Sequence, residues 1–289
     1  MRVINPLRYP GGKACLAPAL AALLQANGLA RPAVAEPYAG AAGASLELLF
    51  GENVQSILIN DLDYRIFCLW WAVLNHTDQF AQRIRSIPLS IYEWKRQRDI
   101  YRNPRKHKRF EVGFATFYLN RTNRSGILLN GGPIGGIRQT GKWGLGARFT
   151  RSTLVNRVER IGAYRERIMI SNLDALAFIQ RVEADFVSQP LFLYLDPPYY
   201  EKGADLYLST YTHDDHVAVG RALRSRKCPY WAVTYDDVPA IRSIYAKCRL
   251  MPFRLRYTAH RVRQGKELLI VPKKLIVPLG LQLGGHSRS

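Results

Sequence analysis

The tetrapeptide Asp196-Pro197-Pro198-Tyr199 follows an apolar run at residues 191–195. The apolar run is typical of a buried strand in a parallel sheet, and two consecutive prolines cannot continue such a strand because neither has an N–H to donate. A carboxylate and an aromatic ring therefore emerge at the carboxyl end of a strand, the edge where open α/β sheets bind ligands. An acceptor beside a flat ring suits a planar molecule that carries an amino group, such as adenine.

A glycine-containing turn with the sequence EPYAGAAG occupies residues 36–43, between a predicted strand and a predicted helix. Gly40 and Gly43 permit positive φ, and the helix that follows offers free N–H groups to a ligand. The turn lacks the full dinucleotide fingerprint, and an ordinary tight turn explains it equally well. Asp61 ends the next predicted strand, 21 residues after Gly40. An acid there can accept hydrogen bonds from ribose hydroxyls or, alternatively, cap the next helix.

Two further segments contain residues that often carry chemistry. The segment RYPGGK at residues 8–13 places glycines before Lys13, but it fails the GxxxxGK[ST] phosphate-loop pattern because Leu7 and Ala14 stand at required positions. Asp174 ends a third predicted strand, where ligand binding and helix capping are both open. The segment HDDH at residues 213–216 looks metal-like, but its histidines have spacing i, i+3 beside a helix start, so we favour capping by Asp214 and expect no metal.

The chain of 289 residues has 42 Lys and Arg against 22 Asp and Glu, a net charge of +20, with 47% hydrophobic residues. Residues 76–151 alone hold four Lys and twelve Arg against two Asp and two Glu, a net charge of +12. A concentrated positive charge favours nucleic acid as the partner, with a solvated basic surface or an acidic membrane as alternatives.

Four cysteines without CxxC spacing indicate neither a zinc site nor a redox motif, and they fit a reducing cytoplasm. The chain contains neither an apolar run of membrane-spanning length nor a signal-peptide core, so we expect a cytoplasmic protein without a membrane partner.

The order of predicted elements indicates an α/β fold. Strands are expected at residues 33–36, 54–60, 168–174, 191–195, 230–235 and 268–271. Helices are expected at residues 14–25, 44–50, 66–74, 88–99, 111–119, 175–182, 214–224 and 238–247. The alternation at residues 1–75 and 152–289 predicts one catalytic domain with a Rossmann-like sheet, and residues 76–151 form a basic, mostly helical insertion.

With these motifs in this order, residues 5–272 resemble the Dam-like class of DNA adenine-N6 methyltransferases. The resemblance implies a Rossmann-like fold that uses S-adenosylmethionine (SAM). It further implies direct methyl transfer, without a covalent enzyme intermediate, to N6 of a flipped-out adenine at a specific site in duplex DNA. Cytosine N4, RNA adenine and a catalytically inactive DNA-binding homologue remain alternatives.

The resemblance also implies roles for individual residues. The carboxylate of Asp196 and the carbonyl of Pro197 would accept the two amino hydrogens of adenine, Pro198 completes the motif, and Tyr199 would stack on the base. The residues expected to hold SAM are Tyr9, Gly11, Lys13, Pro37, Tyr38, Gly40, Gly43, Asp61, Asp174 and Asp196.

Residues 117–126 resemble the start of the family's DNA-recognition segment, and the glycine-rich stretch that follows carries further cations. The residues expected to contact DNA are Arg8, Asn120, Arg121, Arg124, Arg138 and Lys142. Past Gly126 the resemblance fades, so the family's GATC target is not carried over. We expect a monomer bound to double-stranded DNA, and restriction-modification, phage and regulatory roles all fit.

Overall fold

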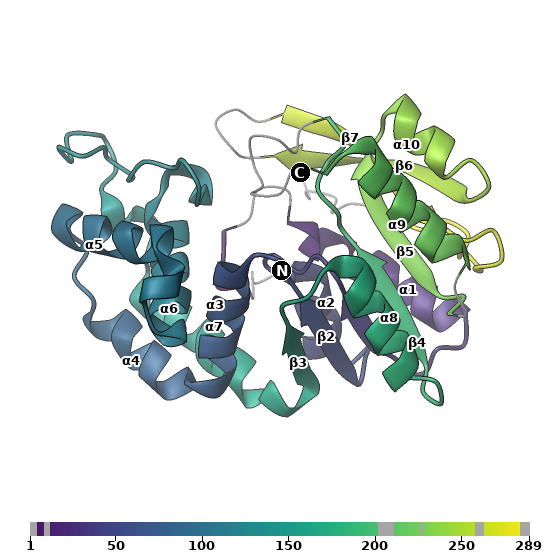
Figure 1. Cartoon of the computed structure of the whole chain (residues 1–289), viewed down its shortest axis with the longest axis horizontal. Coiled ribbons are helices and arrows are strands. Elements are labelled where there is room, and N and C mark those ends of the chain that lie inside the picture. The colour runs from purple at the N-terminus through teal and green to yellow at the C-terminus, as the bar shows by residue number, and fades with distance from the viewer. Residues whose placement is uncertain (1–4, 9–11, 202–210, 226–227, 258–262, 284–289) are drawn as a thin grey trace. The chain divides into compact units, whose positions relative to one another are not determined.

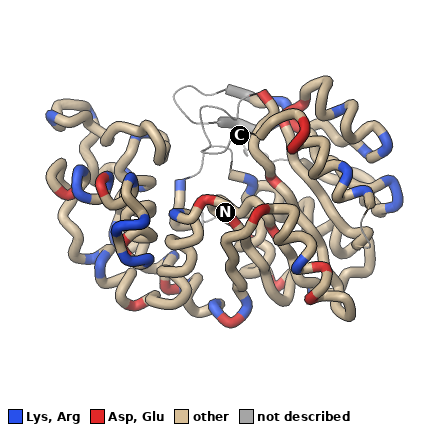
Figure 2. The backbone as a smooth tube through the Cα atoms, in the orientation of Figure 1, with Lys and Arg blue, Asp and Glu red and all other residues tan. Residues whose placement is uncertain are grey.

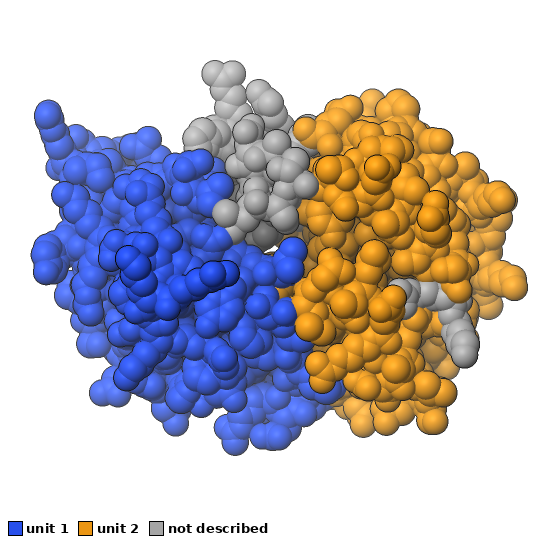
Figure 3. All heavy atoms as spheres, in the orientation of Figure 1, with its two compact units in different colours: residues 1–10, 62–172 blue, residues 11–61, 173–289 orange. Residues whose placement is uncertain are grey.

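The computed structural model describes residues 5–8, 12–201, 211–225, 228–257 and 263–283. The expected SAM residues Tyr9 and Gly11 lie outside these ranges. The chain divides into two compact units, one of residues 1–10 and 62–172 and the other of residues 11–61 and 173–289 (Figure 3). The expected insertion at residues 76–151 falls within the first unit, which extends beyond it on both sides.

The second unit carries six strands that are hydrogen-bonded side by side in the order β2-β1-β4-β5-β7-β6 (Figure 1). These strands are β1 (Ala33–Glu36), β2 (Ser56–Asn60), β4 (Leu191–Leu195), β5 (Trp231–Asp236), β6 (Arg249–Tyr257) and β7 (Arg263–Val271). Neighbours from β2 to β5 run parallel, whereas β7 is antiparallel to both β5 and β6. The chain leaves β1 toward β2 and returns on its other side as β4, so the order reverses between β1 and β4. Ligands bind at this kind of switch point in open α/β sheets.

Helices cover both faces of this sheet. They are η1 (Lys13–Leu16), α1 (Ala17–Ala26), α2 (Gly43–Phe50), α8 (Ala175–Asp185), α9 (His213–Ser225) and α10 (Pro239–Ile244). In Figure 1, α8 and α9 lie on the near face and α1 on the far face. Buried strand side chains such as Leu193 and Val233 pack with Ile179, Leu223 and Ile241 of the near helices. Each such burial contributes roughly 1.5–3 kcal/mol and holds the carboxyl ends of the strands in place.

The first unit is mostly helical. Its elements are α3 (Tyr64–Asn75), α4 (Thr77–Ser86), α5 (Ile91–Arg102), η2 (Pro104–Lys106), α6 (Arg109–Thr122), η3 (Arg124–Gly126), η4 (Leu145–Arg148), α7 (Arg151–Ala163), η5 (Arg165–Arg167) and β3 (Ile168–Ser171). A Cβ atom at Gly113 of α6 would lie 2.9 Å from the Cα of Leu69, so this glycine allows α3 and α6 to pack closely. Lys and Arg outnumber Asp and Glu along this unit (Figure 2).

The structure confirms the predicted strands at residues 33–36 and 191–195 and the α/β class. The helix expected from residue 88 begins at Ile91, because Ser90 caps it by accepting a hydrogen bond from the Glu93 N–H at 3.2 Å. The sequence did not predict α4, α7 or β6. The basic segment at residues 254–266 lies outside every expected strand and helix, yet its described residues belong to β6 and β7. Within the described part of the chain, no helix has the length and apolar character needed to cross a membrane.

Candidate active site

The tetrapeptide directly follows β4, whose five residues are all buried. The side chain of Asp196 retains 23% of its surface accessibility. Its Oδ1 accepts a hydrogen bond of 2.6 Å from Thr234 Oγ1 on the neighbouring strand β5. The carboxylate is therefore oriented by the adjacent strand while part of it stays open to a ligand.

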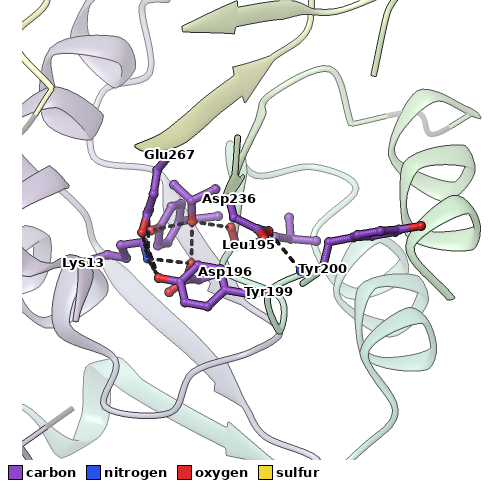
Figure 4. A network of polar contacts seen from close by, with 9 residues as sticks. Lys13, Leu195, Asp196, Tyr199, Tyr200, Asp236 and Glu267 are labelled. Carbon is purple, nitrogen blue, oxygen red and sulfur yellow. Dashed lines mark hydrogen bonds and ion pairs between the residues drawn. The ribbon is translucent and has the colours of Figure 1, made fainter. Parts of the chain in front are cut away.

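Lys13 brings the tetrapeptide together with the last strand of the chain. Its Nζ donates to the Tyr199 hydroxyl at 3.0 Å and lies 3.3 Å from Asp196 Oδ1 and 3.1 Å from Glu267 Oε2. The Tyr199 hydroxyl donates in turn to Glu267 Oε1 at 2.8 Å (Figure 4). Lys13 and Glu267 are 4% and 1% exposed, so the buried ammonium and carboxylates compensate one another. Burial raises the pKa of Glu267, and the Lys13 charge opposes that rise.

The ring of Tyr199 lies against the same cation. Lys13 Nζ is 5.1 Å from the ring centroid, and the tyrosine is 8% exposed. Because Nζ is also only 3.0 Å from the hydroxyl, the cation lies beyond the hydroxyl end of the ring and holds it through the hydrogen bond. The sequence-predicted residues Lys13, Asp196 and Tyr199 are thus brought together within the second unit.

Asp236 at the end of β5 fixes the chain that leaves the tetrapeptide. Its Oδ1 and Oδ2 accept hydrogen bonds from the backbone N–H groups of Tyr200 at 2.9 Å and Glu201 at 3.2 Å. These hydrogen bonds anchor the backbone after Tyr199 to the neighbouring strand β5. They therefore fix the path of the chain as it leaves the two prolines.

The glycine turn is held by Asp61. Gly40 has φ +47°, and its N–H donates to Asp61 Oδ2 at 2.9 Å. The side chain that caps α3 is Asp63, which accepts from the Arg65 N–H at 2.9 Å. The capping alternative for Asp61 is therefore wrong, and its contact with the turn joins the ends of β1 and β2.

A second carboxylate lies at the end of β1. Glu36 is 4% exposed and accepts a hydrogen bond from the Ser45 hydroxyl. Burial is the main cause that raises the pKa of Glu36 to about 8, and the nearby charges of Asp196 and Asp61 raise it further. Acids therefore stand at the carboxyl ends of the three neighbouring strands β2, β1 and β4.

The other residues expected to hold SAM flank this group. The Pro37 carbonyl accepts from Asn60 Nδ2 at 3.0 Å, which ties the turn to β2. The Tyr38 hydroxyl is 2.8 Å from that of Tyr211. Asp174 is exposed and caps α8, since its Oδ1 accepts from the N–H groups of Leu176 and Ala177. Asp174 thus has the capping contacts that the sequence left as an alternative.

Within the first unit, Asn120 and Arg121 are buried at 1% and 9% exposure. Asn120 Oδ1 accepts from the Arg8 N–H at 2.7 Å, and its Nδ2 donates to the carbonyls of Arg8 at 2.8 Å and Gly126 at 3.1 Å. Arg121 Nε donates to the Arg148 carbonyl at 2.8 Å. These contacts give both side chains a positioning role that the sequence did not predict.

The cationic residues expected to contact DNA differ in their burial and in their pKa. Burial and then three neighbouring guanidinium groups lower the pKa of Arg121 to about 9. Arg8 is partly buried, and burial lowers its pKa too. Arg124, Arg138 and Lys142 are exposed, which makes them the better placed of the expected residues to meet a polyanion.

Sequence reasoning missed Glu267, Thr234 and Asp236 as site residues. Each comes from β5 or β7, and the only local signal is an acid beside an apolar strand run, as for Glu267 before residues 268–271. In the segment HDDH, the hydrogen bonds between described residues at the start of α9 involve Asp215 and not Asp214. Asp215 accepts from the Thr212 N–H at 2.7 Å. His216 Nδ1 lies 3.1 Å from the Tyr235 hydroxyl. Among the described residues no group of three or more His, Cys, Asp and Glu could hold a metal ion.

The arrangement can bind a flat molecule that has an amino group and can stabilise positive charge. Its acceptors and carboxylates lie at the switch point of a parallel sheet, and a buried cation organises them. If the group to be transferred to the bound molecule is already activated, the protein needs to supply neither a nucleophile nor a general base.

Comparisons with known proteins identify the chain's relatives. A family model described as D12 class N6 adenine-specific DNA methyltransferase matches residues 9–261. No curated protein matches the chain. Among solved structures, the rRNA methyltransferase aviRa from Streptomyces viridochromogenes is 14% identical, with a TM-score of 0.39, over 91% of this chain and 86% of that one. This structural likeness is too slight to support an argument.

Proposed function

The chain belongs to the D12 class N6 adenine-specific DNA methyltransferase family, and from that premise we propose how its residues perform the reaction. It is an enzyme that methylates adenine in DNA. We propose SAM as the methyl donor and a flipped-out adenine at a specific site in duplex DNA as the acceptor. The observation that carries the proposal is the contact of Lys13 with Asp196, Tyr199 and Glu267 at the end of β4.

The residues at the sheet's switch point fit SAM. SAM carries an ammonium group, a sulfonium and a ribose diol. The carboxylates of Asp61 and Asp196 can attract the two cationic groups or accept hydrogen bonds from the diol, and the carboxyl group of Glu36 can accept a hydrogen bond. When bound, SAM supplies a methyl group already activated by the positive sulfur. The turn at Gly40 and Gly43 would lie against its methionine part and Asp61 against its ribose.

We propose that Lys13 positions the acids of the site and does not bind the carboxylate of SAM. Its ammonium is engaged with Asp196 and Glu267, so we assign Lys13 to these two acids and not to the carboxylate of SAM. In this role Lys13 holds the Asp196 carboxylate in place. Tyr9, Gly11, Pro37, Tyr38 and Asp174 stay as predicted contacts of SAM.

Asp196 and Pro197 would receive the adenine amine. Thr234 and Lys13 both contact Oδ1 of Asp196, so Oδ2 is the oxygen that we assign to one N6 hydrogen, with the Pro197 carbonyl as the acceptor of the other. Two such hydrogen bonds favour a pyramidal nitrogen whose lone pair is available for attack. Pro198 sets the corner, and Tyr199 would stack on the base. The residues thus act by positioning and electrostatics.

The test is nucleoside mass spectrometry of unmethylated duplex DNA after incubation with SAM and the protein. Wild type should produce N6-methyladenine, and Asp196→Ala should produce none while it binds DNA as wild type does. Retained activity in Asp196→Ala would contradict the site assignment. N4-methylcytosine as the product would contradict the adenine pocket, and the absence of SAM binding in calorimetry would contradict the cofactor.

A further inference from the structure

One side chain, that of Gln139, bridges three points of the glycine-rich loop at residues 126–146 of the first unit. Gln139 is exposed, yet its Nε2 donates to the carbonyls of Ile134 at 2.7 Å and Gly136 at 2.6 Å. Its Oε1 accepts from the Leu145 N–H at 3.1 Å. Gly135 and Gly136, at φ +86° and +77°, make the tight path possible. Because the loop is already organised, a ligand would not have to order it on binding.

This loop surrounds an open hollow of about 590 Å³. Three cationic side chains, those of Arg124, Arg138 and Lys142, line it together with Trp143. Trp143 is 64% exposed, and Lys142 Nζ lies 5.9 Å from its ring centroid. The hollow therefore combines positive charge with an accessible aromatic face.

The exposure of Trp143 is unlike that of other tryptophans in the described part of the chain. Trp70, Trp94 and Trp231 are 2%, 1% and 3% exposed, and Trp71 is half-buried. Attraction to phosphate explains exposed lysines and arginines, but it does not explain an exposed indole among them. Bases stack on aromatic rings, and single-stranded nucleic acids are bound by such rings beside basic residues.

We propose that this hollow binds one unpaired nucleotide of the substrate DNA, other than the target adenine. The indole of Trp143 stacks on the base, and the cations of Arg124, Arg138 and Lys142 contact its phosphates. The inference rests on the proposed function, because an adenine that leaves the duplex leaves its partner base unpaired. Stacking on Trp143 then offsets part of the free energy lost when that base pair opens.

The test compares two DNA molecules that need no knowledge of the recognition site. One is a short, fully paired duplex, and the other is the same duplex with a single unpaired nucleotide. Fluorescence anisotropy measures the affinity of wild type, Trp143→Ala and Tyr92→Ala for each DNA. Tyr92 is the matched control, because it is an 81% exposed aromatic residue on α5 that does not line the hollow.

Wild type and Tyr92→Ala should prefer the DNA with the unpaired nucleotide. Trp143→Ala should bind that DNA about tenfold more weakly while its affinity for the paired duplex changes little. Trp143→Phe should keep part of the preference, since a phenyl ring still stacks. Equal affinities of Trp143→Ala and wild type for the DNA with the unpaired nucleotide would overturn the inference.

A second measurement follows Trp143 directly. The fluorescence difference between wild type and Trp143→Phe reports this exposed indole, and the DNA with the unpaired nucleotide should quench it more than the paired duplex does. Equal quenching by both DNAs would also overturn the inference. Failure of the proposed function has another signature, because it is seen as missing N6-methyladenine in wild type, whatever Trp143 binds.

Discussion

The ammonium of Lys13 lies 3.1 Å from Oε2 of Glu267, although the two residues are 254 positions apart in the chain. The same ammonium lies 3.3 Å from Asp196 Oδ1. Strand β7, which carries Glu267, pairs with β5, and β5 pairs with β4. The antiparallel strand β7 thus supplies a second acid to the cation that contacts the tetrapeptide, and Glu267 positions Lys13.

Glu267→Gln should lower the rate constant for methylation about tenfold, with little change in DNA affinity. Glutamine keeps the size of the side chain and can still bond Tyr199, but it removes one of the two negative charges around Lys13. A tenfold change corresponds to about 1.4 kcal/mol in the activation barrier. Single-turnover kinetics measures it.

The pH profile separates this role from simple packing. Burial raises the pKa of Glu267, so its carboxylate takes up a proton as pH falls at a higher pH than an ordinary glutamate would. Wild-type activity should therefore fall on the acid side, and Glu267→Gln should lack that part of the fall. The same acid limb in both proteins would contradict a role for the Glu267 charge.

Thr234→Val should reduce methylation about tenfold, and Thr234→Ser should retain it. The Thr234 hydroxyl donates to Asp196 Oδ1 at 2.6 Å, and a hydrogen bond to a charged group contributes roughly 1.5–3 kcal/mol. Valine keeps the shape of threonine but cannot orient the carboxylate, whereas serine can. Circular dichroism and DNA binding serve as controls for folding. Normal activity of Thr234→Val would mean that Asp196 needs no orientation from β5.

The local parts of this site could be predicted from the sequence because their signals are contiguous. An apolar run that ends in Asp196 and two prolines defines the end of β4, and the glycine turn after residues 33–36 defines the end of β1. Parallel strands meet with their carboxyl ends at one edge, so Asp61 and Asp196 could be expected near each other before the structure was known.

The remaining parts depend on contacts between distant segments. Glu267 and Thr234 follow no motif, and their roles arise only when β7 and β5 pair beside β4. The basic residues at 254–266 obscured a strand pair, because their charges break the apolar pattern that indicates strands. The sequence predicts Asn120 as a DNA contact only through the resemblance of residues 117–126 to the family's recognition segment. Its burial and its hydrogen bonds to Arg8 and Gly126 depend on the packing of distant residues, which that resemblance does not show.

Asn120→Ala should lower the free energy of unfolding, whereas Arg138→Ala should leave it nearly unchanged. Asn120→Ala leaves the backbone groups of Arg8 and Gly126 without their amide partner, so the free energy of unfolding should fall by about 1–3 kcal/mol. Arg138→Ala, at an exposed site, should change it by less than about 0.5 kcal/mol. Urea unfolding measures both values.

DNA binding should show the reverse pattern for this pair. Arg138→Ala should weaken binding and lower the slope of log affinity against log salt by about one, as expected for the loss of one phosphate contact. Asn120→Ala, if folded, should keep the wild-type slope. A reduced slope in Asn120→Ala with unchanged stability would contradict its positioning role.

Glu36 should make the unbound protein less stable as pH rises toward 8. Burial and neighbouring acids raise the pKa of Glu36 from 4.5 to about 8, so the folded state binds this proton more tightly than the unfolded state. The contribution to stability is fully present below about pH 4.5 and is lost as pH rises through about 8, and it amounts to several kcal/mol at most. Urea unfolding across this pH range measures the loss.

Glu36→Gln is the matched variant, because glutamine stays neutral and can still accept the hydrogen bond from Ser45. Its free energy of unfolding should depend less on pH than that of wild type, and the difference between the two proteins should grow between about pH 5 and pH 8. Ser45→Ala removes the bond that lowers the Glu36 pKa, so its loss of stability should extend to higher pH. Parallel curves for wild type and Glu36→Gln would show that Glu36 is already ionised in the folded protein.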